Sequence, residues 1–431
     1  MTTDNRSINW LRVAILVIAG GVIYILPYLR YGYYDAMMEA LKITNSEMGY
    51  IMSAYAVFAL PGYFFGGFLA DKFSAKNLLS FAFISTGVGG FYMMTFPGYM
   101  QTLLLHCFWG ISTTLLFWPA YWKVVRFSAG EDQQGTILGV VHGARKIFSL
   151  VVSSIGVWVF AMFAVPVKGF TAAIAFFSVV HIAVGLLFYF CFKEEGADAK
   201  TEDKKSDSLG LKDIVVVMKM PLTWYLSGFL FSVYFCYRFN ADFMTTYLSK
   251  GIGISAVLAG FMGYAKQFGI AGVSSGCGGY AVNKFGATKT NCFGVVVGVG
   301  GALLLAVVPM NAANQYFAIG AIILYMFGVW MSYSMWNAFL EEAKIPSKIT
   351  GSIIGVVSTI GFTPEVIVPL IGGGLLDSCG LEAGFRYMWL IAAGTGSMAF
   401  VFLYLIVKTV PNVRDQYKAA AHRLATVSVG K

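Results

Sequence analysis

Long apolar runs separated by short polar loops make up most of the chain. Each run holds about twenty residues, enough for an α-helix to cross the hydrocarbon core of a bilayer. The sequence therefore predicts twelve membrane-spanning helices. Their approximate spans are 11–34, 47–70, 77–97, 100–124, 136–164, 169–193, 222–248, 255–282, 290–309, 315–340, 350–376 and 385–409.

A polar stretch divides these runs into two sets of six. It lies at 193–213 and is rich in Lys, Glu and Asp, so we expect a solvated linker that ends in a short amphipathic segment, Leu211 to Met220. The predicted domains are an N-terminal six-helix bundle (1–193), a cytoplasmic linker (194–220), a C-terminal six-helix bundle (221–412) and a cytoplasmic tail (413–431).

Composition supports a lipid environment. Hydrophobic residues form 58% of the chain and charged residues only 12%, whereas soluble domains carry about 25% charged residues. The net charge of +9 could suggest nucleic acid, but an excess of Lys and Arg on cytoplasmic loops gives the same sum, and no nucleic-acid reading motif is present. The loop charges predict that both termini lie in the cytoplasm, and we expect a multi-pass protein of the cell (inner) membrane.

Several chemistries are excluded by missing motifs. The six cysteines are scattered without a CxxC spacing, so we expect small buried residues rather than metal ligands or disulfides. No phosphate-binding loop, metal-ligand cluster or nucleophile–base pattern occurs. The sequence therefore predicts no enzyme activity, no cofactor and no ATP-driven motor.

The two halves carry matching segments in corresponding helices. Residues 67–76 match 279–289, residues 135–141 match 351–357, and Arg30 matches Arg238. The matches occur in the same order and six helices apart, so the copies share one orientation in the membrane. This indicates a parallel repeat about an axis along the membrane normal.

The first matching segment carries a motif, Gly-Phe-Leu-Ala-Asp-Lys followed by a second lysine, between the second and third helices. It resembles the signature loop of the major facilitator superfamily, with Ser74 in place of the usual glycine. The resemblance implies an all-α membrane protein with twelve transmembrane helices in two pseudo-symmetric six-helix bundles. We interpret the aspartate as a latch for a gate; a plain basic topology loop is the alternative. The candidate gating residues are Gly67, Asp71, Lys72, Lys76, Asn283 and Lys284.

Arg30 and Arg238 lie inside apolar runs, where hydrocarbon cannot solvate a guanidinium. The repeat would place both on the pseudo-axis. Paired guanidinium groups there could present forked donors to phosphate or carboxylate oxygens. We therefore predict that they hold an anionic substrate; snorkelling of Arg30 to the outer interface is the alternative.

The pattern of one arginine in the first helix and one in the seventh, each preceded by tyrosines, is similar to that of the organophosphate–phosphate antiporter family. In that family the paired arginines bind the phosphate, which implies this role for Arg30 and Arg238. His142 is the candidate for that family's fifth-helix histidine, although the local spacing does not align. Carboxylates and sulfonates stay open as substrates.

Four of the other charged residues inside predicted helices are further candidates. Arg145 and Lys146 stand about ten residues past the loop before the fifth helix; one could line the cavity while the other pairs with an acid, or both could snorkel to the cytoplasm. Glu365 in the eleventh helix is either part of a structural ion pair or the site of proton coupling. Asp242 follows Arg238 by one turn and either orients it or lies at the outer interface.

Aromatic residues cluster at a similar depth. Their hydroxyl and indole N–H groups can line a polar cavity, and their rings can pack a small organic body; packing or interface anchoring is the alternative for any single residue. The candidates are Tyr28, Tyr31, Tyr234, Tyr237, Trp118, Trp122 and Trp336.

Together these features predict a secondary transporter that moves a small organic anion by alternating access, coupled to anion exchange or proton symport. The expected partners are the anion, protons or phosphate as coupling ions, and the lipid bilayer; we expect a monomer. Two alternatives stay open. One is a proton-coupled carrier of a neutral or cationic solute, with the arginines bound internally to Asp242 and Glu365. The other is a transporter-like membrane receptor.

Overall fold

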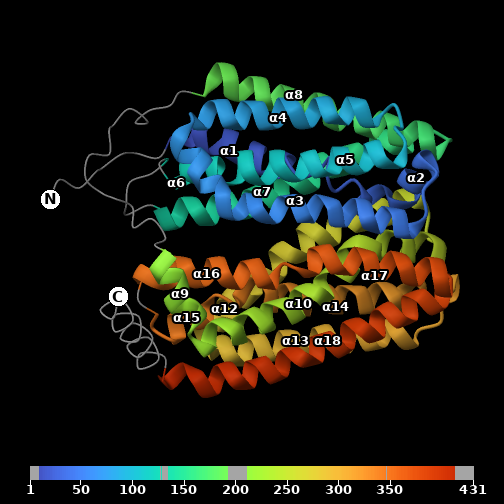
Figure 1. Ribbon diagram of the computed structural model, residues 1–431. Helices are drawn as coiled ribbons and strands as arrows, with labels where there is room; N and C mark the ends of the chain where they lie inside the picture. The colour runs from blue at the N-terminus through green and yellow to red at the C-terminus, as the bar shows by residue number, and fades with distance from the viewer. Residues whose placement is uncertain (1–8, 127, 129–133, 193–210, 346, 413–431) are drawn as a thin grey trace. The chain divides into compact units, whose positions relative to one another are not determined.

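The computed structural model describes residues 9–126, 128, 134–192, 211–345 and 347–412 (Figure 1). Regular structure in these ranges is helical throughout. The elements are α1 (Trp10–Val22), α2 (Arg30–Leu41), α3 (Asn45–Lys72), α4 (Ala75–Met93), α5 (Tyr99–Gly110), η1 (Ile111–Phe117), α6 (Trp118–Arg126), α7 (Gln134–Ala161), α8 (Pro166–Cys191), α9 (Leu211–Met218), α10 (Pro221–Thr246), η3 (Tyr247–Gly251), α11 (Ala256–Tyr264), η4 (Ala265–Ile270), α12 (Ala271–Phe285), α13 (Ala287–Val307), η5 (Ala312–Asn314), α14 (Gln315–Met335), α15 (Ala338–Glu342), α16 (Ser347–Gly361), α17 (Pro364–Cys379), α18 (Leu381–Thr409) and η6 (Val410–Asn412).

Each predicted span is mostly helical, and α9 confirms a short helix at the end of the linker. In the described ranges, seven helical runs are long and apolar enough to cross a membrane, while α1 is a shorter apolar helix. The all-helical membrane architecture is therefore confirmed. The count of twelve crossings stays a prediction.

Helix packing groups the chain into two compact units. The first unit comprises residues 1–200, 242–272 and 369–378, and the second comprises 201–241, 273–368 and 379–431. In the first unit α1 packs on α7, α3 on α5, and α4 on α8 (Figure 1). In the second unit α13 packs on both α14 and α18. The first unit thus combines N-terminal helices with segments from the C-terminal half of the sequence; the predicted division into two six-helix domains stays a prediction.

Several of the predicted spans are interrupted helices. The first is divided because residues 23–29 form turns between α1 and α2, where Pro27 has no N–H to donate to a helical ladder. A second break separates α16 from α17 just before Pro364. Three π-helical segments, η1, η3 and η4, lie within or beside other spans. Interruptions of this kind are frequent at functional sites.

Loop chemistry explains where several uninterrupted helices begin. Thr44 and Glu47 form a reciprocal capping box at the start of α3. The side chain of Ser74 caps the start of α4. Its backbone φ is −55°, so this position does not require a glycine. Its counterpart before α13, Gly286, has φ 86°, a conformation that favours glycine.

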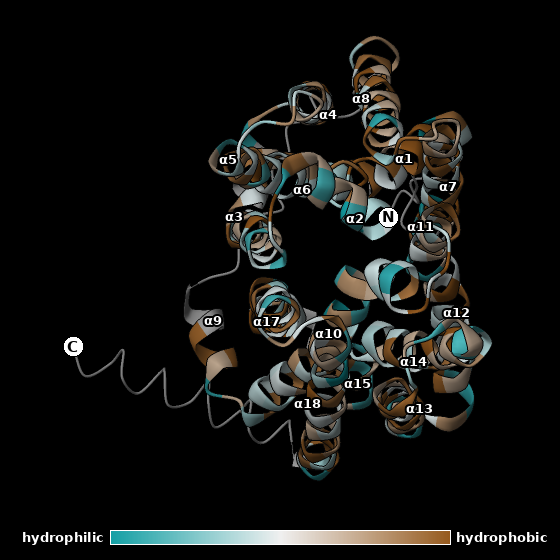
Figure 2. Cartoon of the chain, turned by 90° about the vertical axis from the view of Figure 1, so that its right-hand side faces the viewer, coloured by the Kyte–Doolittle hydropathy of each residue, from teal (hydrophilic) through white to brown (hydrophobic). Residues whose placement is uncertain are grey.

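Large apolar side chains are exposed along helices such as α8 and α13, which are largely brown in Figure 2. Phe190 on α8 is 73% exposed, and Val307 on α13 is 68% exposed. Exposed apolar surface of this extent is unfavourable in water but matches lipid tails. These faces therefore fit contact with the bilayer.

Small residues allow α13 and α14 to pack closely in the second unit. A Cβ added at Gly328 on α14 would lie within 3.0 Å of backbone atoms of Gly294 and Gly298 on α13. Without a hydrophobic force between helices in lipid, such close backbone approach is a main source of association. The contact therefore depends on glycine at this position.

We expect Gly328→Ala to destabilise the protein by about 1–3 kcal/mol, because backbone atoms cannot move aside cheaply. The measurement is the melting temperature of the detergent-purified protein. Gly320→Ala on the same helix is the matched control, since a Cβ there meets nothing within 4 Å. Equal melting temperatures for the two variants would contradict this account of the α13–α14 contact.

Candidate functional site

Arg30, the first predicted substrate ligand, forms a buried ion pair. It is the first residue of α2, directly after the break that follows α1. Its Nε donates to Asp242 Oδ1 at 2.7 Å, and both side chains are 1% exposed. Its Nη1 also donates to the carbonyl oxygen of Pro27 at 3.4 Å. The broken helix end thus supplies one of the acceptors of this guanidinium.

Aromatic rings surround the same guanidinium. Its carbon lies 4.5 Å from the ring centroid of Tyr28 and 5.1 Å from that of Tyr31, distances at which cation–π attraction operates. The two tyrosine rings stack at 5.0 Å. Tyr55 packs edge-on against Tyr28 and shares a hydrogen bond of 2.8 Å with Thr113 Oγ1. The two predicted tyrosines therefore do contact Arg30, and sequence analysis missed Tyr55.

Arg238 on α10 has a comparable environment in the second unit. Its Nη1 lies 3.6 Å from Glu365 Oε1, and Glu365 Oε2 accepts a hydrogen bond of 3.0 Å from Tyr234. Arg238 is 1% exposed and the Glu365 side chain 12%. Glu365 lies in the first turn of α17, at the positive end of the helix dipole, which favours a negative charge.

Further rings pack beside this second pair. Tyr237 lies 5.8 Å from the Arg238 guanidinium and stacks on Tyr333, and Trp330 packs edge-on against Tyr237. Trp336, the residue predicted from α14, is buried beyond the end of that helix. In the part of the chain that the structure describes, its ring has no contact with this cluster. Trp330 and Tyr333, which lie in the same predicted span as Trp336, supply the ring contacts here, and a site role for Trp336 stays a prediction.

The partner of Asp242 corrects one interpretation. Sequence spacing suggested that Asp242 orients Arg238, one turn earlier on α10. The carboxylate instead bonds Arg30, from the other half of the sequence. For Glu365, the structure has the ion-pair geometry that was one of the two alternatives. The convergence of Arg30 and Arg238 on a shared cavity stays a prediction.

The fifth-helix residues lie together in the first unit. The guanidinium of Arg145 on α7 lies 5.6 Å from the ring centroid of Trp118 and 5.8 Å from that of Trp122, both on α6. The ring of His142 stacks on Trp122 at 4.4 Å. Lys146 follows Arg145 and is half-buried. Four predicted site residues thus form one cluster, in which Arg145 contacts rings rather than an acid.

The predicted gating loop is only partly described. The surroundings of Gly67 and the side chain of Asp71 lie outside what the structure describes, so the latch stays a prediction. Lys72 ends α3 and Lys76 lies in the first turn of α4. A neighbouring contact holds the end of α3, because Lys123 Nζ donates to the carbonyl oxygen of Ala70 at 2.7 Å.

In the second copy of this loop, Asn283 and Lys284 are both exposed. The Lys284 ammonium lies near the rings of Tyr280 and Phe285. Glu342 on α15 lies at this end of the second unit, and its Oε1 accepts a 2.6 Å bond from the backbone N–H of Ala287. Glu342 therefore caps α13, which sequence analysis did not anticipate.

The opposite end of the first unit contains hydrogen bonds between the two halves of the sequence. Asp35 on α2 accepts bonds from Thr246 and Ser249, and Lys250 Nζ lies 3.3 Å from it. The Thr245 hydroxyl donates to the carbonyl oxygen of Tyr31 at 2.6 Å.

A second acid acts in the same way nearby. Asp377 on α17 accepts bonds of 3.2 and 2.8 Å from the backbone and side chain of Asn45, and one of 2.7 Å from the backbone of Ser46. Close backbone approach adds to this contact, because Gly260 on α11 packs against the carbonyl of Gly32. These bonds and contacts join α2 and α3 to α10, η3, α11 and α17.

Sequence analysis also missed Lys266 and Gln267 on η4. Both are buried, with exposed fractions of 2% and 7%. The sequence feature that could have identified them is the one that identified Arg30: each is a polar side chain in the middle of an apolar run. His106 and His181 are both buried, and each bonds a backbone carbonyl one turn earlier on its own helix, that of Thr102 and that of Phe177 respectively.

The cysteines agree with the sequence only in part. Cys107 and Cys236 are buried, but Cys191, Cys277 and Cys379 are exposed. An apolar run predicts helix in lipid, and it does not say which face of the helix is covered by protein. The expectation that the cysteines are mostly buried was therefore wrong.

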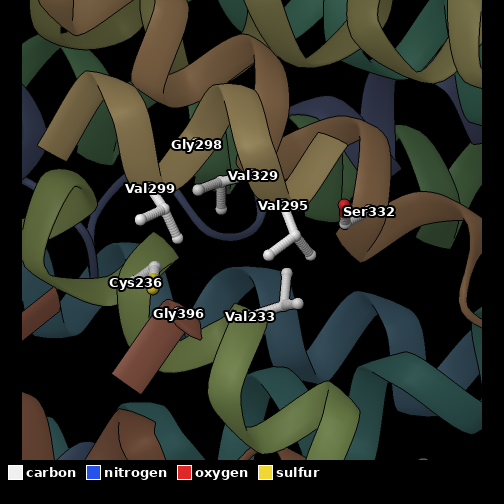
Figure 3. A pocket seen from close by; sticks show the side chains of 8 residues that line it. All are labelled: Val233, Cys236, Val295, Gly298, Val299, Val329, Ser332 and Gly396. Carbon is white, nitrogen blue, oxygen red and sulfur yellow. The ribbon is translucent and has the colours of Figure 1, made fainter. Parts of the chain in front are cut away.

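A small cavity lies in the second unit among α10, α13, α14 and α18 (Figure 3). It measures about 10 Å³ and is lined by apolar and small side chains, including Val233, Cys236 and Ser332. That space is about the minimum for one water molecule. The cavity therefore results from helix packing and is too small to hold an organic solute.

Comparison with known proteins identifies the family. The model of the Major Facilitator Superfamily matches residues 13–364. The chain is 30% identical to the inner membrane protein YqcE of Escherichia coli (strain K12), over 94% of this chain and 96% of that one. It is 21% identical to the probable galactarate/D-glucarate transporter GudP of Bacillus subtilis (strain 168), over 86% of each chain.

A solved structure has the same fold. The D-xylose–proton symporter superposes with a TM-score of 0.73 at 16% identity, covering 94% of this chain and 99% of that chain. The interrupted helices, the intramembrane ion pairs and the family match agree with one another. The chain is a transporter rather than an enzyme, and it belongs to the Major Facilitator Superfamily.

Proposed function

We propose that the protein carries a small organic anion together with protons by alternating access. The observation that carries the proposal is that two buried arginines, Arg30 and Arg238, form ion pairs with the carboxylates of Asp242 and Glu365. A guanidinium keeps its charge at physiological pH, whereas a carboxylate loses its charge by binding one proton. Each pair can therefore change from neutral to positive when a proton arrives.

Protonation and anion binding then favour one another. If Glu365 is protonated, the positive charge of Arg238 is uncompensated in a medium of low dielectric constant, which is unfavourable. An anionic group of the solute removes that cost. By linkage, the bound anion in turn favours the protonated acid. The anion and the proton therefore enter and leave together.

The name of one relative agrees with an organic anion as the substrate. GudP is described as a probable transporter of galactarate and D-glucarate, both of which are sugar dicarboxylates. A dicarboxylate carries two negative charges, and the described residues include two buried ion pairs, each of which becomes positive when its acid binds a proton. The substrate proposed here is therefore a small carboxylate, with phosphate and sulfonate esters as other members of the anion class.

The bonds around Asp35 and Asp377 support alternating access. They join α2 and α3 to helices from the C-terminal half of the sequence at one end of the first unit. A solute can pass that end only after these bonds break. Because most of them are exposed or half-buried, each contributes about 1 kcal/mol or less. We propose that this end is a gate, closed in the present structure.

A second candidate function is a proton-coupled carrier of a neutral solute. It is favoured by the same ion pairs, because an arginine that keeps its carboxylate offers no net charge to an anion. In that case the aromatic rings near Arg30 and Arg238 would contact the solute, and the pairs would serve the protein alone. The charge of the solute separates the two candidates.

We expect galactarate to raise the melting temperature of the purified protein and to enter proteoliposomes faster when the outside is acidic. Galactitol, which has the same carbon skeleton without the carboxylates, is the matched control and should do neither. Stabilisation and uptake of galactitol without any effect of galactarate would overturn the anion proposal in favour of the neutral solute.

The ion pair of Arg30 needs a charge-balanced variant, because Arg30→Gln alone leaves Asp242 buried without its partner at a cost of about 3–5 kcal/mol. The double variant Arg30→Gln with Asp242→Asn should melt near the wild-type temperature and lose galactarate uptake. A double variant that folds and transports galactarate normally would assign the pair a structural role only.

Glu365→Gln tests coupling separately from binding. The amide cannot release a proton, so we expect uphill galactarate uptake driven by a pH gradient to be lost. Exchange of labelled for unlabelled galactarate across proteoliposomes should persist, because it needs no net proton movement. Uphill uptake at the wild-type level would remove Glu365 from the coupling mechanism.

A further inference from the structure

We propose that Arg145, rather than Arg30 or Arg238, makes the first contact with an anionic group of the solute. This inference rests on the proposed function and names a binding residue for it. Arg30 and Arg238 are neutralised by carboxylates in this structure, so each needs a proton before it can attract an anion. A guanidinium that lacks a carboxylate attracts an anion at once.

Arg145 has that property. Within the described residues it forms no ion pair, and its buried Nε has no hydrogen-bond partner. Only part of the side chain is covered. It lies eleven residues after the first residue of α7 (Gln134–Ala161), which corresponds to about 16 Å along the helix. An arginine at that depth in a membrane helix normally faces a wet cavity or a partner.

Its neighbours hold the guanidinium in place while leaving its charge uncompensated. The rings of Trp118 and Trp122 attract the cation at 5.6 and 5.8 Å, but they carry no net charge. The Cδ of Arg145 lies beside Gly20 of α1, where an added Cβ would collide first with the hydroxyl of Tyr121. Ser149, one turn later, donates to the carbonyl oxygens of both Gly21 and Arg145, which fixes α7 against α1.

A second donor lies one turn earlier on the same helix. The ring of His142 is stacked on Trp122 and exposed. Residues three apart on a helix lie on the same face, so His142 and Arg145 can both reach a carboxylate or phosphate group. The indole rings of Trp118 and Trp122 can pack the carbon skeleton of the solute. The cluster therefore offers a charge, a hydrogen-bond donor and an apolar surface together.

The test compares Arg145→Gln with Arg386→Gln, which removes an exposed positive charge from α18. Binding is measured by the thermal shift with galactarate, glycerol 3-phosphate and 2-hydroxyethanesulfonate as separate probes. We expect Arg145→Gln to weaken binding of the effective probe by about 10–100-fold, as loss of a charge-assisted hydrogen bond predicts. Arg145→Lys should recover part of the affinity, and Arg386→Gln should bind like wild type.

Intrinsic fluorescence supplies a readout that a merely structural role would not move. An anion at Arg145 should change the emission of Trp118 and Trp122, and the change should disappear in the Trp118→Phe/Trp122→Phe variant. If no anion stabilises the wild type, the proposed function itself fails. If an anion binds the wild type and Arg145→Gln equally well, the proposed function stands and this assignment is wrong.

Discussion

The compensation of buried positive charge is the constraint on which the rest of the structure depends. A guanidinium cannot lose its proton inside a protein, so an arginine that is fully buried among apolar helices must find acceptors. Arg30 finds Asp242 and the carbonyl of Pro27, and Arg238 finds Glu365. Removing either acid would leave a charge whose burial costs several kcal/mol. The helices that supply these groups are therefore fixed relative to one another within each unit.

The interruptions of the helices follow from the same constraint. An unbroken helix uses its carbonyls and N–H groups internally and has none to offer a side chain. The turns at 23–29 free the carbonyl that Arg30 binds, and the break before α17 places Glu365 at the positive end of the dipole of that helix. Irregular backbone at membrane depth is tolerated only where protein or water covers it, and both pairs are buried.

The sequence was informative about types of residue and less so about their partners. The length of each apolar run predicted a helix there. The free-energy cost of placing a charged side chain in lipid singled out Arg30, Arg238, Asp242 and Glu365. Residue spacing reports only neighbours in the same helix, so it suggested that Asp242 orients Arg238. The bond from Asp242 to Arg30 depends on the packing of α2 against α10, which no local pattern reports.

Similar limits apply to the smaller details. Glu342 caps a helix that begins 55 residues earlier, and Tyr55 joins the Arg30 cluster from α3; neither has a signal in its own segment. By contrast, Lys266 had the same signal as Arg30, and equal treatment of every charge in an apolar run would have found it. Ser74 differed from the family motif, and its φ angle explains why a serine is accepted there.

One consequence follows from the π-helical segment η3. A π turn accommodates about one residue more than an α turn, and each residue of an α-helix advances by about 100° around the axis. Thr246 precedes η3, whereas Ser249 and Lys250 lie inside it. If the turn tightened to α geometry, Ser249 and Lys250 would swing around the axis away from Asp35, while Thr246 would keep its place. A screw-like twist of one short segment would thus undo most of that carboxylate's contacts without unwinding the helix.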